Sequence, residues 1–204
     1  MFARMPLSAR RWAAVIAAVA AVSLVADLAD RSLRLDLPLR IAAWEGLRHF
    51  TILTSLLITV TMTIIALRPA LPDAPWLAAL TLGIVSVAGL DHTLLVASST
   101  PTALGGWSDQ GLHTAVPVMM GCWWLWHAPK RRLIWADLPI FAMWPAVYAT
   151  YALARGAQDG IYPYPFIDPV ALGSAQVAAN LAGIIIAFLL GGIVMVSVGR
   201  FADR

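Results

Sequence analysis

The sequence predicts an all-α membrane protein, a single domain over residues 1–204 in which six transmembrane helices form a bundle. Sixty per cent of the residues are apolar and 12% are charged, about half of the charged share that keeps a soluble domain in water. The charged residues lie in short clusters between long apolar runs. Six spans of roughly 20 residues each use nearly the whole chain, which leaves little room for a soluble domain.

The six spans are expected at 12–29, 41–67, 75–98, 110–126, 133–154 and 170–198. The first follows Arg10 and Arg11, and a basic start before a short apolar core is also typical of a secretory signal peptide, including the twin-arginine kind. The apolar run continues past Asp27 through Leu28 and Ala29, however. This continuation favours a retained first span over a cleaved signal.

Each later span is bounded by a polar, basic or proline-containing connection. The second ends at Arg68-Pro69, and a loop rich in small residues, 98–106, follows the third. A basic turn, 127–132, separates the fourth from the fifth. The loop 155–169, which contains Tyr-Pro-Tyr-Pro-Phe at 162–166, leads into the sixth.

The Lys and Arg bias predicts the orientation. If the N-terminus is cytoplasmic, the cytoplasmic side carries Arg4, Arg10, Arg11, Arg68, Lys130, Arg131, Arg132, Arg200 and Arg204, and the outer side carries Arg31, Arg34, Arg40, Arg48 and Arg155. This bias favours both termini in the cytoplasm of a multi-pass protein of the cell inner membrane. The net charge of +3 comes from residues that flank spans, so we expect membrane lipids, and no nucleic acid, as partners.

Polar and ionisable side chains gather in the outer half of the predicted bilayer. They are Glu45, Arg48 and His49 in the second span, Asp91 and His92 in the third, His113 in the fourth, and Gln176 and Asn180 in the sixth. Ionisable groups inside a span cost several kcal/mol unless they are paired or face a cavity. Glu45 and Arg48 can simply pair on one helix face, and Asp91 can pair with His92 or Arg48. Convergence from four helices nevertheless predicts a polar cavity beneath the Tyr-Pro loop.

The second span also carries hydroxyl groups at Thr51, Ser55, Thr59 and Thr63, four residues apart and therefore on one stripe. Most such hydroxyls in membrane helices bond to the carbonyl one turn earlier or make small helix contacts. Thr51 differs because it lies at the depth of the ionisable cluster. A threonine needs a base to act as a nucleophile, and spacing alone does not choose among the histidines at 49, 92 and 113.

The chain contains no Gly-x-Ser-x-Gly elbow, no His-Glu-x-x-His motif, no P-loop and no Gly-x-Gly-x-x-Gly fingerprint. Cys122 is the only cysteine, which excludes an intramolecular disulfide and a cysteine metal cluster. Local motifs therefore leave the function open.

Three segments resemble the androgen-induced gene 1 / androgen-dependent tissue-factor-pathway-inhibitor-regulating protein family of six-span membrane proteins, including its bacterial branch. They are His-Phe-Thr-Ile-Leu-Thr-Ser-Leu at 49–56, Gly-Leu-His-Thr-Ala-Val-Pro at 111–117 and Tyr-Pro-Tyr-Pro-Phe-Ile-Asp at 162–168. Asn180 fits the asparagine of the family's last span. The segments occur in the family's order and cover most of the chain.

The resemblance implies a threonine hydrolase of lipid esters such as fatty acid esters of hydroxy fatty acids. Thr51 would be the nucleophile and His113 the base, with no cofactor and no metal, and the lipid ester would enter from the bilayer. Residues expected to support catalysis or bind substrate are His49, Thr54, Asp91, His92, Tyr164, Gln176 and Asn180. Of these, Asp91 is a candidate to orient a histidine, and Tyr164, Gln176 and Asn180 are alternative candidates to donate to the oxyanion.

The sequence departs from the family at two places. Thr54 is a rival nucleophile, because the segment reads Phe-Thr-Ile-Leu-Thr-Ser. Asp91-His92 has no counterpart in the animal members, so the substrate or the activity can differ.

Two other classes of function stay open. His49, His92 and His113 on neighbouring helices could ligate a haem or a metal ion. The ionisable cluster would also suit a small transporter or a lipid-binding protein without chemistry, although the chain has no inverted repeat.

Overall fold

The computed structural model describes residues 5–68, 73–90 and 102–201. Helices make up 87% of the structure and the described residues contain no strand, which confirms the predicted all-α class. In chain order the elements are α1 (Leu7–Arg34), α2 (Leu39–Gly46), α3 (Phe50–Leu67), α4 (Ala74–Leu90), α5 (Ala103–Gln110), the π-helical turn η2 (Gly111–Ala115), α6 (Val116–His127), the 3₁₀ turns η3 (Lys130–Arg132) and η4 (Trp135–Asp137), α7 (Leu138–Asp159), the 3₁₀ turn η5 (Pro165–Ile167), α8 (Pro169–Leu172) and α9 (Ser174–Phe201).

The chain forms two compact units. Unit 1 comprises residues 1–73 and 83–129, and unit 2 comprises residues 74–82 and 130–204. Helix α4 therefore contributes its first half to unit 2 and its second half to unit 1.

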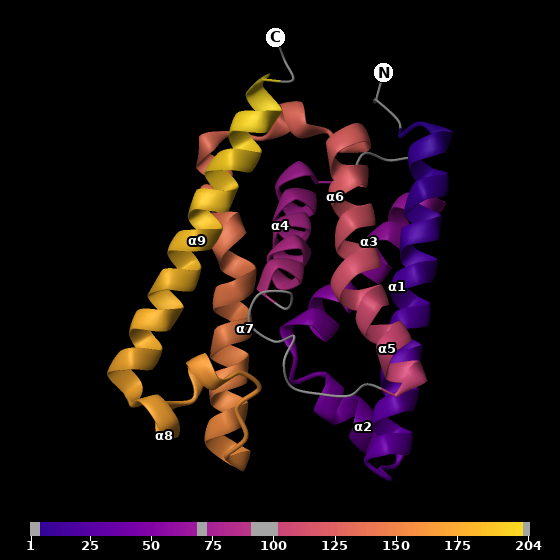
Figure 1. The fold of residues 1–204 in the computed structure, drawn as a ribbon. Coiled ribbons are helices and arrows are strands. Elements are labelled where there is room, and N and C mark those ends of the chain that lie inside the picture. The colour runs from indigo at the N-terminus through magenta and orange to yellow at the C-terminus, as the bar shows by residue number, and fades with distance from the viewer. Residues whose placement is uncertain (1–4, 69–72, 91–101, 202–204) are drawn as a thin grey trace. The chain divides into compact units, whose positions relative to one another are not determined.

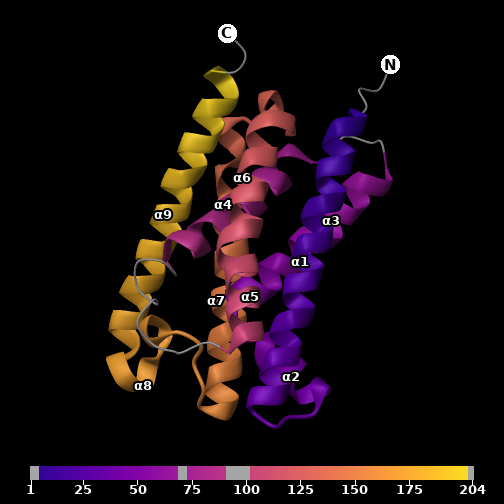
Figure 2. The same ribbon diagram turned by 45° about the vertical axis from the view of Figure 1, so that its right-hand side comes forward.

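Helix α1 is the centre of unit 1. It packs mainly along α3 and also contacts α2, α5, η2 and α6 (Figures 1 and 2). Its buried face carries small residues at three- and four-residue spacing, among them Ala9, Ala13, Ala17 and Ala20. Small side chains let helix backbones approach closely, which is how apolar helices associate where the hydrophobic effect is weak.

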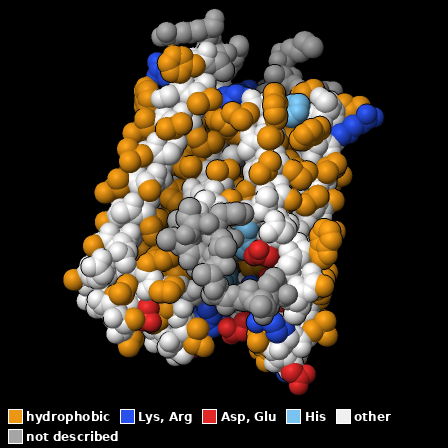
Figure 3. Space-filling view, viewed as in Figure 1, with side chains coloured by type: hydrophobic (Ala, Val, Ile, Leu, Met, Phe, Trp, Pro, Cys, Tyr) orange, Lys and Arg blue, Asp and Glu red, His pale blue; other side chains and the backbone are white. Residues whose placement is uncertain are grey.

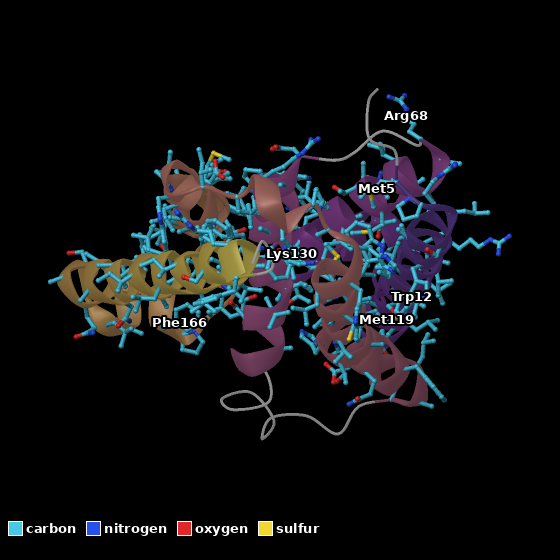
Figure 4. All side chains as sticks on the ribbon, turned by 90° about the horizontal axis from the view of Figure 1, so that it is seen from above. Met5, Trp12, Arg68, Met119, Lys130 and Phe166 are labelled. Carbon is cyan, nitrogen blue, oxygen red and sulfur yellow. The ribbon has the colours of Figure 1, made fainter. Side chains whose placement is uncertain are left out.

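Polar contacts fix the register of the helices around α1. The Arg10 guanidinium donates to the carbonyl of Ala66 at 2.8 Å, near the end of α3, where the helix dipole favours a cation. The indole of Trp123 on α6 donates to the Ala9 carbonyl at 2.9 Å. Beyond the end of α3, the exposed side chain of Arg68 projects away from the helices (Figure 4).

Helix α1 extends beyond the predicted span, which ended at residue 29. Ion pairs one turn apart support its last two turns, between Arg31 and Asp27 at 2.7 Å and between Arg34 and Asp30 at 3.4 Å. Such pairs stabilise helices by about 0.2–0.5 kcal/mol each.

The chain predicted as one span over 41–67 consists of two helices, because α2 ends at Gly46 and α3 begins at Phe50. At the break, the N–H of His49 bonds to the Gly46 carbonyl three residues earlier. His49 itself has extended backbone angles, φ −94° and ψ 135°. Glycine is a poor helix former, and Gly46 lies close against Arg31 and Asp27 of α1, so the turn occurs where the backbone approaches that ion pair.

Elements α5, η2 and α6 follow one another without interruption from residue 103 to residue 127. The helical stretch therefore begins seven residues before the predicted fourth span, 110–126. The single π turn precedes Pro117, which lacks an N–H and whose ring clashes with the carbonyl four residues earlier, that of His113. Widening the turn relieves this clash, and such π turns are frequent at functional sites.

Unit 2 is built on the pairing of α7 with α9. Gly192 of α9 packs against Phe141 of α7 so closely that an added Cβ would lie 2.9 Å from the ring. Helix α7 begins at Leu138, five residues after the predicted start, because the 3₁₀ turn η4 follows the basic turn, which itself contains η3. Lys130, in η3, lies beside the last turns of α9 (Figure 4).

Helices α1, α3 and α9 are each long and apolar enough to cross a membrane, and α4 is apolar but shorter. Large apolar side chains such as Val22, Leu67 and Val194 are exposed, as expected of lipid-facing surfaces. Figure 3 shows hydrophobic side chains over the helix surfaces and most charged side chains toward the helix ends. These features give the chain the character of a membrane protein.

Candidate active site

The structure brings Thr51 and His113 together inside unit 1. The Nε2 atom of His113 lies 3.3 Å from the Oγ1 atom of Thr51, although the two residues are 62 positions apart in the sequence. Thr51 is 6% exposed and the His113 side chain is 20% exposed. A buried hydroxyl and an imidazole nitrogen therefore share a hydrogen bond between two helical segments, α3 and η2.

The position of Thr51 in α3 explains why its hydroxyl reaches a histidine. The hydroxyls of Thr59 and Thr63, later in the same helix, donate to carbonyls four residues earlier at 2.8 and 2.7 Å. Thr51 is the second residue of α3, so the carbonyl four residues before it belongs to Leu47, ahead of the helix. The break between α2 and α3 thus releases the Thr51 hydroxyl from the ordinary bond of a helical threonine.

The first turn of α3 also places backbone N–H groups around Thr51. The first helical bond runs from the N–H of Leu53 to the carbonyl of His49, and the His49 side chain makes no cap. The N–H groups of Thr51 and Ile52 precede that bond and have no carbonyl one turn earlier within the helix. They carry the positive end of the helix dipole, which favours negative charge.

A close helix contact sets the position of His113. Gly111 in η2 lies against Ser23 of α1, where an added Cβ would come within 2.0 Å of the serine hydroxyl oxygen. Only glycine permits this approach. The approach and the π turn together orient the imidazole toward α3.

Asp109 is the polar residue of this site that sequence reasoning missed. Its Oδ1 atom lies 2.9 Å from Nδ1 of His113, one helical turn away, and its side chain is 51% exposed. The approach lacks the alignment of a hydrogen bond, since Nδ1 is buried and makes none. The available signal was the four-residue spacing Asp-x-x-x-His, which places both side chains on one helix face.

Several other polar groups of unit 1 are close in sequence to Thr51. Thr54 and Ser55 are fully buried in α3, and the Ser55 hydroxyl has no hydrogen-bond partner among the described residues. Glu45 and Arg48 form the structural pair considered from the sequence, with an Nη2–Oε2 distance of 3.1 Å. The Nδ1 atom of His49 lies 3.3 Å from the carbonyl oxygen of Gly46.

Asp91 and His92 are outside the described residues. Tyr164, Gln176 and Asn180 belong to unit 2, where they form a connected set.

In that set, Gln176 donates to the Asn180 side chain at 3.0 Å, and Asn180 donates to the Phe166 carbonyl at 2.8 Å. Tyr164 stacks on the Phe166 ring, with centroids 5.2 Å apart. These contacts attach the Tyr-Pro loop to the first turns of α9.

Within residues 5–68, 73–90 and 102–201, no three His, Cys, Asp or Glu side chains are grouped as metal ligands. Of the three histidines considered for a haem or a metal ion, His92 lies outside these ranges.

The arrangement in unit 1 can perform nucleophilic chemistry, because a hydroxyl, a base and a carboxylate follow one another at contact distances. Comparisons with protein-family models, with curated proteins and with solved structures found no match to this chain.

Proposed function

We propose that this chain is a membrane hydrolase of lipid esters in which Thr51 is the nucleophile and His113 the general base. The observation that carries the proposal is the 3.3 Å contact between His113 Nε2 and Thr51 Oγ1. A hydroxyl and an imidazole at this separation can exchange a proton. Without such a base, a threonine hydroxyl keeps its proton at neutral pH and is a weak nucleophile. The apolar character of α1, α3 and α9 supports a substrate that resides in the bilayer.

In the first half of the reaction, Thr51 Oγ1 attacks the ester carbonyl carbon while Nε2 of His113 accepts the hydroxyl proton. The carbonyl oxygen becomes an oxyanion. The N–H groups of Thr51 and Ile52, at the N-terminus of α3, are suited to receive it. Donors of this kind contribute about 3–4 kcal/mol each to acyl transfer. The C–O bond to the alcohol then breaks, and the alcohol leaves with the proton from His113.

In the second half, water attacks the acyl-threonine and His113 accepts a proton from it. The bond between the acyl carbon and Oγ1 breaks, and Oγ1 regains a proton from His113. The net reaction is ester plus water giving a carboxylic acid and an alcohol. Water can reach the imidazole from the side of Asp109, whose side chain is half exposed.

The proposal includes six spans with both termini in the cytoplasm. The helices in these six spans are α1, α2 with α3, α4, α5 through α6, α7, and α9. Residues 103–127 form a continuous helical stretch of roughly 37 Å, and α7 is roughly 33 Å long at 1.5 Å per residue, so both exceed the roughly 30 Å hydrocarbon core. In this topology the Thr51–His113 pair lies toward the outer face of the cell inner membrane.

We further propose that the chain belongs to the bacterial branch of the androgen-induced gene 1 family. The basis is the three short segments and their order. The substrate class is then fatty acid esters of hydroxy fatty acids or similar lipid esters, which enter laterally from the bilayer.

The test compares two buried threonines of the same helix. Thr51→Val and Thr54→Val remove one hydroxyl each and keep the shape of the side chain. With purified protein in lipid nanodiscs and a fatty acid ester of a hydroxy fatty acid, we expect Thr51→Val to lose about 10²- to 10⁴-fold in kcat. Thr54→Val should keep kcat within about threefold.

Thr51→Ser completes the set, because serine keeps the hydroxyl and should retain measurable turnover. Full turnover by Thr51→Val, or loss in Thr54→Val alone, would overturn the assignment of the nucleophile.

A further inference from the structure

The geometry points to Asp109 as a positioning residue that holds His113 with its proton on Nδ1, so that Nε2 presents a lone pair to Thr51. This inference rests on the proposed function, and it adds a third member to the reacting pair. The members come from two segments of unit 1, Asp109 and His113 from the continuous helix 103–127 and Thr51 from α3.

Two interatomic distances define the array. Asp109 Oδ1 lies 2.9 Å from His113 Nδ1, and His113 Nε2 lies 3.3 Å from Thr51 Oγ1. A neutral imidazole has one N–H donor and one lone pair, and an ionised carboxylate has only acceptors. If Nδ1 carried the lone pair, two acceptors would face each other at 2.9 Å. The proton therefore belongs on Nδ1, which leaves Nε2 as the base.

The bond between Asp109 and His113 still requires a rotation. Nδ1 is buried and makes no hydrogen bond, although the carboxylate oxygen is within hydrogen-bond distance. The Asp109 side chain is half exposed, so it can turn with little resistance from packing. Catalytic hydrogen bonds that are poorly aligned in the free enzyme commonly align when substrate is bound.

Contacts with α1 on both sides of Asp109 hold the helical segment that carries it. Thr102 caps α5 by accepting from the N–H of Gly105 at 2.9 Å, and its hydroxyl donates to the carboxylate of Asp30 on α1. The Asp30 carboxylate also forms an ion pair with Arg34, so both of its contacts are with groups other than His113. Ser23 contacts Gly111 two residues before His113. Asp109 is thus on a segment whose position against α1 is fixed, as a positioning residue requires.

The surroundings of Asp109 also leave its side chain half exposed. Trp107, two residues earlier, is 79% exposed, as is typical of an indole at a membrane–water interface. A carboxylate at that level keeps contact with water while its Oδ1 faces the imidazole. Asp109 differs in this from a deeply buried triad aspartate.

The test uses Asp109→Asn, Asp109→Glu and, as a matched control, Asp36→Asn. Asp36 is exposed in the connection between α1 and α2 and has a φ of 51°, a conformation that asparagine tolerates. A buried triad aspartate contributes about 10⁴-fold to kcat, and because Asp109 is half exposed we expect a smaller loss, about 10- to 100-fold, in Asp109→Asn. KM should stay unchanged, Asp109→Glu should recover part of kcat, and Asp36→Asn should match the parent chain.

A second readout does not depend on turnover. Histidine labelled with ¹⁵N reports the tautomer of each ring, and the His113 signals are those lost in His113→Gln. We expect the Nδ1–H form in the parent chain and in Asp36→Asn, and a shift toward the Nε2–H form in Asp109→Asn. Absence of ester turnover in the parent chain would refute the hydrolase while the tautomer still tests Asp109. An unchanged tautomer in Asp109→Asn overturns the inference whether or not the chain is a hydrolase.

Discussion

Units 1 and 2 both contain polar side chains that the sequence predicts at one membrane depth. The hydrogen-bond partners of these side chains differ between the two units. In unit 1 the Thr51–His113 hydrogen bond joins α3 to a separate helical segment, and these are the two groups to which we assign the proposed reaction. In unit 2 Gln176 and Asn180 bond to each other and to the carbonyl of Phe166, 14 residues from Asn180. The hydrogen-bond partner of each polar atom therefore distinguishes a bond between two helices in unit 1 from a loop anchor in unit 2.

The largest expected effect is on turnover when the base is removed. His113→Gln keeps a polar side chain of similar size and should lower kcat about 10²- to 10⁴-fold, because Thr51 loses its proton acceptor. The control is His127→Gln at the end of the same continuous helix, where the ring packs near Trp12 and Trp123. Steady-state hydrolysis of a lipid ester measures both, and equal losses in the two variants would contradict the role of His113.

A smaller loss is expected when the α1 contact is disturbed. Gly111→Val places a side chain where a Cβ would already lie 2.0 Å from the Ser23 hydroxyl oxygen, so α1 and η2 must separate. We expect about a 10- to 100-fold fall in kcat, because misplacement by about 1 Å weakens catalysis to this extent. Gly183→Val, at a helical glycine with open space around it, is the control. Turnover in Gly111→Val equal to that of Gly183→Val would show that the contact does not position His113.

In unit 2 the expected effect is on stability. Asn180→Ala removes the donor to the Phe166 carbonyl and should lower the free energy of unfolding by about 1 kcal/mol. Turnover per folded molecule should stay unchanged, since the proposed reaction uses no group of this cluster. Thermal unfolding in detergent and kinetics on the same preparation give the two values. A loss of kcat at unchanged stability would return Asn180 to the list of oxyanion donors.

The smallest effect is expected within α3. Thr59→Val removes a hydroxyl that donates to the Ser55 carbonyl, a bond that adds little to a helix already held by its backbone. Kcat should remain within about twofold of the parent chain, and the melting temperature should change by no more than a few degrees. A loss as large as that of Thr51→Val would remove the distinction between Thr51 and the ordinary hydroxyls of this helix.

The sequence was sufficient for the helical class and for the approximate helix positions, because long apolar runs and basic turns determine both. It did not reveal the break at residues 47–49, since one glycine does not by itself end a helix and the contact of Gly46 with α1 is tertiary. That break is what gives Thr51 its distinctive partner.

Asp109 was missed for a related reason. The predicted fourth span began at residue 110, so Asp109 was left outside it, whereas the helix begins at Ala103 under the cap supplied by Thr102. Within a helix, the spacing to His113 becomes a contact. Pairing Thr51 with His113 came from the resemblance, because spacing alone left three histidines open.

Covalent labelling of Thr51 tests the central proposal most directly. A fluorophosphonate that mimics a lipid ester is incubated with the protein in nanodiscs, and the modified residue is located by tandem mass spectrometry. We expect an adduct on Thr51. The adduct should also form in Thr54→Val, and it should be strongly reduced in His113→Gln. An adduct on Thr54, or undiminished labelling of Thr51 in His113→Gln, would contradict it.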